Sequence, residues 1–305
     1  MVKTYGLSHL SSGDLLRESA LYPLMLGLLA VAALTKSAQW PFHFWLPQAM
    51  SAPTPASAYL HSATMVKAGI YLMARMNPVL GETELWFWLF STIGLITMVL
   101  GAYLGLKQND LKALLAYSTI SQLGVLMMLI GQDTEIAFKA LVVGVLAHAL
   151  YKSALFLVAG TVDHESGTRD LQQLGGLREK MPLTAVLAIV AGLSMAGLPP
   201  MFGFLAKETL LATAVHQSLP TFVTWVLAAG SVLAGALMLA QAGLLVFGTF
   251  WGKPGEATSK AHEAPKLMLL APAIPALLSL AIGILPEPEI LASLLAKSAE
   301  AAFGD

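Results

Sequence analysis

Apolar runs long enough to cross a lipid bilayer take up most of this sequence, and they constrain its fold more than any other feature. A membrane-spanning helix needs about 20 mostly apolar residues. The runs are continuously apolar rather than alternating, which favours helices over strands. The sequence therefore predicts an all-α, polytopic membrane bundle of about eight transmembrane helices, near 21–40, 54–77, 85–106, 111–131, 136–161, 182–213, 220–250 and 266–286.

The composition agrees with a chain that is surrounded by lipid. Hydrophobic residues make up 56% of the chain and charged residues only 11%, whereas soluble domains carry about 25% charged residues. A net charge of −1 argues against nucleic-acid binding, which needs a basic face. The chain has no cysteine, which excludes disulfides, thiolate zinc sites and cysteine-held iron–sulfur clusters. We expect no cofactor, no metal and no nucleic-acid partner.

Polar segments divide the chain into three parts. Residues 1–20 predict an extramembrane loop, residues 21–286 hold all the spans, and residues 287–305 predict an amphipathic tail at the membrane interface. About eight spans put both termini on one side of the membrane. The loops on the other side carry the excess of Lys and Arg, which predicts that this other side is cytoplasmic and that both termini lie outside.

Two of the spans are interrupted by proline. One break follows Lys36, in the sequence TKSAQWP, and the other lies at Pro199-Pro200. Proline removes a backbone donor and clashes with the preceding turn. Broken helices are tolerated in lipid where they are buried in protein or line a wet cavity, and paired breaks are typical of transporters built from inverted repeats. A simple kink is the alternative explanation of either break.

Several ionisable side chains lie inside the spans, where their energetic cost indicates a function. Desolvation disfavours the charged form of an amine, so a buried lysine can exchange its proton near neutral pH. Histidine suits the intermediate positions of such a chain. The sequence predicts a proton relay formed by Lys36, His61, Lys67, His148, Lys152, Lys207 and Glu208.

Helical spacing supports parts of this relay. His148 and Lys152 are four residues apart and stack on one face of a helix. In the span predicted at 54–77, a polar stripe faces the bundle interior, and it consists of Ser57, His61, Thr64, Lys67 and Tyr71. His61 could equally be a hydrogen-bonded packing residue.

Four further polar residues could serve either in the relay or in helix packing. Asp110 can cap the helix that begins at Leu111, and Lys112 can extend toward the membrane interface. Ser118 and Gln122 can form interhelical hydrogen bonds. We treat Asp110, Lys112, Ser118 and Gln122 as relay or packing residues.

Four segments carry a resemblance to a known family. Residues 35–72, 108–124, 148–160 and 194–208 resemble, in order, the antiporter-like proton channels shared by Mrp sodium/proton antiporters and respiratory complex I. Three segments are most similar to the large Mrp subunit, MrpA. They are SATMVKAGIYL, residues 163–177 and AHEAP. The resemblance implies the inverted-repeat fold of that family, with this chain matching the later part of the core and the first repeat largely missing.

The resemblance also implies roles for matching residues. Lys36 and Lys207 correspond to the lysines of the two broken helices. His61 and Lys67 correspond to bridging groups of the second span. His148 and Lys152 correspond to the centre of the second half-channel, and Asp110 and Lys112 to a charged pair in a further segment.

The implied function is proton translocation within a multisubunit Mrp-type sodium/proton antiporter, in the plasma membrane of a prokaryote. The expected partners are other membrane subunits, protons, Na⁺ and lipid, and the chain is a transporter component rather than an enzyme. One alternative is a proton-pumping subunit of complex I or of a membrane-bound hydrogenase. A second alternative is an incomplete subunit with a scaffold role only.

Overall fold

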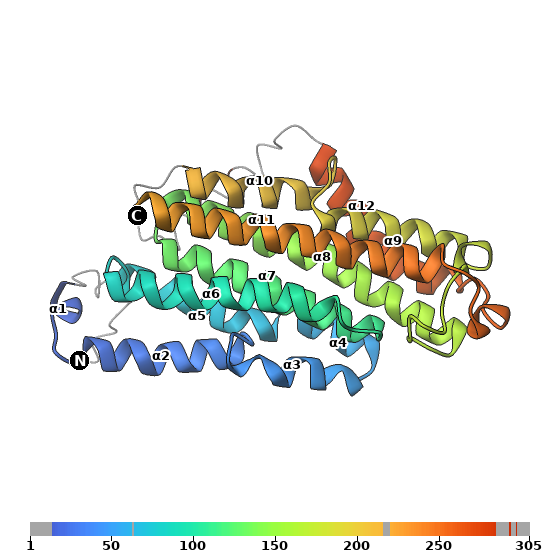
Figure 1. The fold of residues 1–305 in the computed structure, drawn as a ribbon, viewed down its shortest axis with the longest axis horizontal. Coiled ribbons are helices and arrows are strands. Elements are labelled where there is room, and N and C mark those ends of the chain that lie inside the picture. Colours follow the sequence, from blue (N-terminus) through green and yellow to red (C-terminus); the bar gives the residue numbers. More distant parts are fainter. Residues whose placement is uncertain (1–13, 63, 216–219, 285–292, 294–296, 298–305) are drawn as a thin grey trace, which may run out of the picture.

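The computed structural model describes residues 14–62, 64–215, 220–284, 293 and 297. Within these ranges the chain is helical and has no strand. Figure 1 shows the long helices running side by side along one axis. The helices are α1 (Asp14–Arg17), α2 (Tyr22–Lys36), α3 (Trp45–Gln48), α4 (Thr54–Ser62), α5 (Ala68–Leu80), α6 (Glu84–Gly105), α7 (Leu111–Gln132), α8 (Glu135–Ser166), α9 (Pro182–Ala196), α10 (Phe202–Val215), α11 (Thr221–Gly243) and α12 (Lys266–Ile284).

Five helices in the described ranges are long and apolar enough to cross a membrane: α6, α7, α8, α12, and α11 with the π-helical turn that extends it to Gly248. Elsewhere two shorter helices follow one another along the chain: α2 and α3, α4 and α5, and α9 and α10. The prediction of an all-helical membrane bundle is confirmed. The tail predicted at 287–305 lies outside the described ranges except for Ser293 and Lys297, and so does most of the loop predicted at 1–20.

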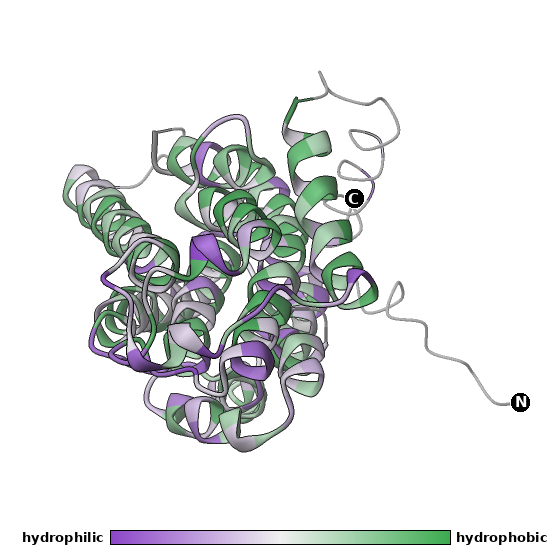
Figure 2. Ribbon diagram, turned by 90° about the vertical axis from the view of Figure 1, so that its right-hand side faces the viewer, coloured by the Kyte–Doolittle hydropathy of each residue, from purple (hydrophilic) through white to green (hydrophobic). Residues whose placement is uncertain are grey.

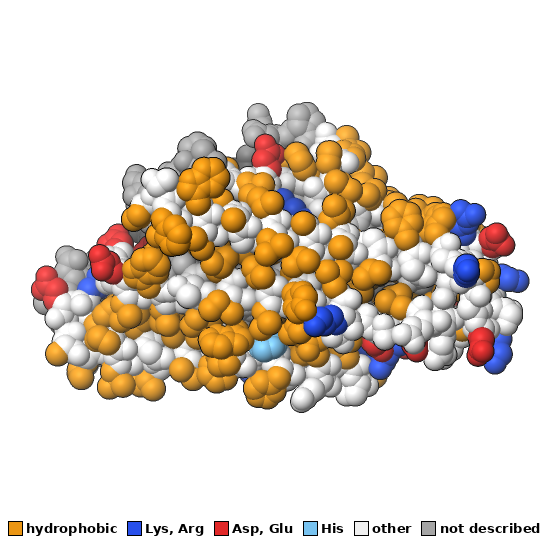
Figure 3. Space-filling model, viewed as in Figure 1, with side chains coloured by type: hydrophobic (Ala, Val, Ile, Leu, Met, Phe, Trp, Pro, Cys, Tyr) orange, Lys and Arg blue, Asp and Glu red, His pale blue; other side chains and the backbone are white. Residues whose placement is uncertain are grey.

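The outside of the bundle is apolar along its length. Figure 3 shows hydrophobic side chains over most of one face, with charged side chains mainly at the two ends. Figure 2, viewed along the bundle, shows the same contrast between hydrophobic helices and hydrophilic connections. This distribution fits a lipid-embedded middle and two solvated ends. We call the end with segments 106–110, 167–181 and 249–265 the loop side, and the end with segments 81–83 and 133–134 the opposite side.

Helix α7 forms the centre of the bundle. In its apolar window 83% of the residues are buried, against 22% for α11 and for α12, so the last two lie at the periphery. Glycines bring α6 onto α7: a Cβ at Gly94 would lie 2.4 Å from Met128 N, and one at Gly124 would lie 2.4 Å from Met98 N. Only hydrogen fits at these positions, so the two backbones pack in direct contact.

At the first proline break, hydrogen bonds to other parts of the chain hold the interrupted segment in place. Helix α2 ends at Lys36, and Trp40-Pro41 is a cis peptide bond. The indole nitrogen of Trp45 donates to Thr35 O at 3.0 Å, and Ile70 N donates to Ser37 Oγ at 3.1 Å. The break is therefore an ordered feature rather than a simple kink.

The second break follows the same principle. Helix α9 ends at Ala196, and Gly197 follows it in the left-handed conformation with a φ of 72°. Ser194 Oγ accepts a hydrogen bond from Gly203 N at 3.2 Å and pairs with Ser279 Oγ at 2.8 Å. These contacts hold the start of α10 against both α9 and α12.

The structure has a third break, which the sequence does not predict. The span predicted as one helix at 54–77 is interrupted between α4 and α5 by a 3₁₀ turn at Met65–Lys67. In a continuous helix the carbonyl of Ser62 would accept from the N–H of residue 66, but here it accepts from Lys67 Nζ. The predicted stripe is wrong at its far end, because the side chain of Tyr71 faces outward with the residue 70% exposed.

Candidate functional site

Five ionisable side chains are buried inside the bundle. His61, His148 and Lys152 have 0% exposure, Lys112 has 1% and Lys67 has 8%. His148 lies within electrostatic range of Lys67, Lys152 and His61. His61 lies in turn within range of Lys152 and Lys112. These interactions link the five groups from Lys67 at one end, through His148, Lys152 and His61, to Lys112 at the other, and we call them the buried row.

The outer lysines of the buried row bind main-chain carbonyl oxygens. Lys67 Nζ donates to Val145 O at 3.1 Å as well as to Ser62 O. Lys112 Nζ donates to Ala52 O at 2.6 Å. Lys112 is only 1% exposed, so the segment before α4 covers it at the start of α7.

Lys152 occupies the centre of the row. Its Nζ donates to Leu115 O at 3.0 Å and contacts Ser118 Oγ closely. Over the described ranges no lysine of the row forms an ion pair with a carboxylate. A buried ammonium without a counter-ion is costly, which favours groups that change their protonation state over fixed charges.

The two histidines of the row pack against aromatic rings. His61 stacks on Phe156 with ring centroids 4.6 Å apart, and His148 meets Tyr151 edge-on at 5.5 Å. All four imidazole nitrogens are buried and have no hydrogen-bond partner among the described residues. Buried polar atoms are normally paired, so these nitrogens are available to neighbouring titratable groups or to ordered water.

Local sequence explains how the helices present these groups. Thr134 caps α8 by accepting from Ala137 N at 3.2 Å, and α8 then continues for 32 residues to Ser166. His148 and Lys152 thus lie near the middle of the longest helix. Packing of α8 against α4 and α7 brings His61 and Ser118 to the same depth.

Asp110 has a structural role. It caps α7 by accepting from Ala113 N at 2.9 Å, as predicted, and it also forms an ion pair with Arg169. Backbone hydrogen bonds join the same segments, from Leu111 N to Arg169 O at 3.0 Å and from Leu171 N to Asn109 O at 2.7 Å. The sequence does not single out Arg169, because its neighbours indicate only a solvated loop.

Lys207 lies apart from the buried row, across a pocket. Its Nζ donates to Ala196 O at 2.5 Å, at the second break. The pocket has a volume of about 340 Å³, and its polar lining includes Gln122, Tyr151 and Lys207. Tyr151 also contacts His148, so this pocket, lined mostly by apolar residues, lies between the row and Lys207. Glu208 is exposed and is not part of this arrangement.

The structure does not bring Lys36 to the row. Lys36 is exposed at the end of α2, on a face that also exposes Leu24, Leu28 and Val31. Among the described residues no group of three histidine or acidic side chains could hold a metal ion.

Comparison with known proteins places these features in a family. The family described as "NADH:quinone oxidoreductase/Mrp antiporter, TM" matches residues 3–250 of the chain. The chain belongs to this family. It is 47% identical to the A/B component of a probable K(+)/H(+) antiporter of Rhizobium meliloti and 41% identical to the A1 component of the Na(+)/H(+) antiporter of Staphylococcus aureus. Each similarity covers 92% of this chain, but the chain spans only 28% and 37% of the respective relatives.

A solved structure supports the same assignment. The fold matches a chain in the structure of the Mrp complex from Dietzia sp. DQ12-45-1b with a TM-score of 0.85 and 41% sequence identity. The match covers 94% of this chain and 31% of that chain. The similarity to this family, predicted from four sequence segments, is confirmed.

Proposed function

We propose that this chain carries a proton path of an Mrp-type monovalent cation/proton antiporter. The observation that carries the proposal is the buried row, a series of titratable side chains inside an apolar bundle. Such groups are expensive in a membrane protein and mark ion or proton pathways. The chain would act as a transporter component rather than as an enzyme.

In this path a proton moves between neighbouring groups of the row. A neutral lysine amine accepts a proton, and an adjacent imidazole takes it up and passes it on. Lys152 has His148 and His61 within electrostatic range, so it can exchange with either side. A proton on one group repels a proton on the next, which makes transfer stepwise.

The remaining predicted groups would extend the path. Water in the pocket beside Tyr151 and Gln122 would connect His148 to Lys207. Lys36 would meet another part of the antiporter, because its exposed position on an apolar face suits a neighbouring membrane helix. Residues 21–286 would act together as the transmembrane unit.

The names of the relatives guide the proposed cargo and setting. One is named for K⁺ and one for Na⁺, so we propose a monovalent cation, with Na⁺ as the first candidate. Other membrane subunits of a hetero-oligomeric complex would be the partners, in the plasma membrane of a prokaryote. Both relatives are named as components of antiporters, which favours antiport over a redox-driven pump.

Replacement of Lys152 tests the function. In everted vesicles from cells that express the complete antiporter with this sequence, Lys152→Ala should abolish cation-driven proton exchange while the complex still assembles. Lys152→Arg should fail as well, because arginine hardly deprotonates.

The matched control is Lys139→Ala, on the same helix. Lys139 is half-exposed and pairs with Glu135 at the surface, so its loss should leave exchange unchanged. Normal exchange by the Lys152→Ala complex would refute the proposed path and would favour a scaffold role.

A further inference from the structure

A groove on the loop side lies between α4, α8 and α12. Its volume is about 530 Å³, and its polar lining consists of Thr54, Thr161, Asp163 and His164. The apolar residues Leu157 and Met268 also line it. The groove therefore combines two hydroxyl groups with two titratable side chains where α8 approaches the end of the bundle.

The groove approaches the buried row on the side of Lys112, which does not itself line it. Asp163 attracts Lys112 electrostatically. Lys112 Nζ donates to Ala52 O at 2.6 Å, only two residues before Thr54. Thr54 itself packs against α8, since a Cβ at Gly160 would lie 2.6 Å from Thr54 Cγ2. Thr54, which lines the groove at the start of α4, thus lies two residues from the carbonyl that binds the last lysine of the row.

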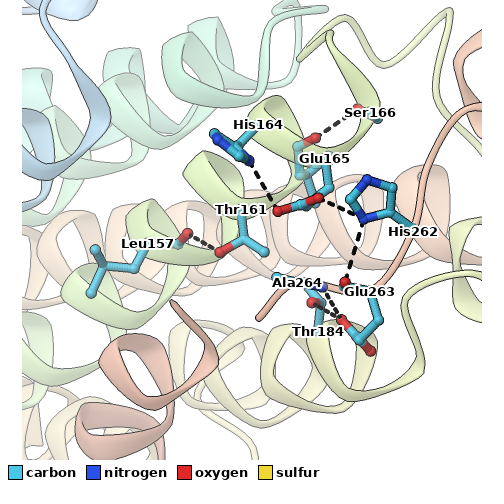
Figure 4. Close-up of polar contacts among 10 residues, drawn as sticks. Leu157, Thr161, His164, Glu165, Ser166, Thr184, His262, Glu263 and Ala264 are labelled. Atoms are coloured by element: carbon cyan, nitrogen blue, oxygen red, sulfur yellow. Dashed lines mark hydrogen bonds and ion pairs between the residues drawn. The ribbon is translucent and has the colours of Figure 1, made fainter. Parts of the chain in front are cut away.

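A buried carboxylate organises the rim of this groove. The side chain of Glu165 is only 2% exposed, and its two oxygens contact His164 Nδ1 at 3.0 Å and His262 Nδ1 at 2.8 Å. Figure 4 shows the two imidazoles on either side of Glu165, one from α8 and one from the segment before α12. Their side chains are 71% and 73% exposed, so both reach solvent while Glu165 holds them in place.

The adjacent Glu263 fixes this segment to α9. Its carboxylate accepts from Leu183 N at 2.6 Å and from Thr184 Oγ1 at 2.7 Å, which satisfies donors at the start of the helix. The segment that carries His262 is therefore anchored on both sides, and the rim is a built arrangement rather than a loose loop.

We propose that this groove is the aqueous mouth of the proton path on the loop side, with Asp163 as its first acceptor. The inference rests on the proposed function. The Asp163 carboxylate takes a proton from water or from a rim imidazole and becomes a carboxylic acid. It then releases the proton through water and the threonine hydroxyls to the neutral amine of Lys112, which becomes an ammonium, and Asp163 returns to the carboxylate.

Water access can be measured independently of transport, because the chain contains no cysteine. In the assembled complex with any other cysteines removed, Thr54→Cys should react with a charged, membrane-impermeant thiol reagent applied to the loop side only. Ala154→Cys, on a fully buried position of α8, should stay unreactive. Reaction of Thr54→Cys only with a lipid-soluble reagent, or no reaction, would overturn the proposal in favour of a groove filled by lipid or by another protein of the complex.

Transport measures the role of Asp163. Asp163→Asn should cause a several-fold loss of proton exchange at unchanged assembly, and Asp163→Glu should restore most of it. The control is Glu179→Gln, an exposed carboxylate on the same side and outside the groove. Unchanged exchange by Asp163→Asn would remove Asp163 from the path, whereas continued exchange by Lys152→Ala would instead refute the buried row.

Discussion

At the scale of single residues, the buried lysines share one mode of binding. Lys67, Lys112, Lys152 and Lys207 all donate to main-chain carbonyl oxygens, and only Lys152 also has a hydroxyl partner, Ser118. We predict that Ser118→Ala reduces proton exchange and destabilises the protein by about 1 kcal/mol, the usual net contribution of one hydrogen bond. The control is Ser153→Ala on α8, where the hydroxyl donates only to the local carbonyl of Leu150. Vesicle transport and thermal unfolding in detergent measure the two effects, and equal behaviour of the two variants would contradict the assigned role of Ser118.

At the scale of elements, the first broken helix depends on a glycine in its neighbour. A Cβ at Gly69 would lie 2.1 Å from Ala33 O and 2.5 Å from Ser37 Oγ, so α5 can approach α2 only without a side chain there. We predict that Gly69→Ala pushes the helices apart and costs about 1–3 kcal/mol, as overpacking does. Gly27→Ala is the matched control, because no atom lies within 4 Å of a Cβ at that position of α2. Thermal unfolding in detergent should show a lower midpoint for the first variant only, and a tolerated Gly69→Ala would mean that the contact between α2 and α5 is loose.

At the scale of the whole molecule, the distribution of basic residues predicts the orientation in the membrane. The loop side exposes Lys107, Arg178, Lys180 and Lys260, among others, and such an excess marks the cytoplasmic side. We predict that an impermeant maleimide added to intact cells labels Glu135→Cys, on the opposite side, and spares Gln172→Cys, on the loop side. Both positions are exposed in the structure, and permeabilised cells should show labelling of both. The reverse pattern in intact cells would mean that the proposed proton mouth faces outside.

Much of this architecture is encoded locally in the sequence. Continuous apolar runs predict helices because lipid offers no partner for an unpaired backbone group. Proline marks the breaks after Lys36 and before Lys207 because it removes a donor and clashes with the preceding turn. The spacing of His148 and Lys152 is enough to place both on one face of α8, and the four segments of family likeness identify the family that the comparisons then confirm.

Tertiary structure alone decided which polar groups meet. The break between α4 and α5 has no proline at that point, and it appears only in the structure, as a 3₁₀ turn at Met65–Lys67 and the contact of Lys67 Nζ with Ser62 O. The sequence places Lys112 near a helix end, but packing of the segment before α4 buries it against Ala52 O. Lys36 shows the opposite outcome. The sequence places it inside an apolar run, but in the structure it lies on the surface of the described bundle. Periodicity reports the face of one helix, whereas burial and charge pairing depend on which other helices cover that face, and this is settled only by long-range packing.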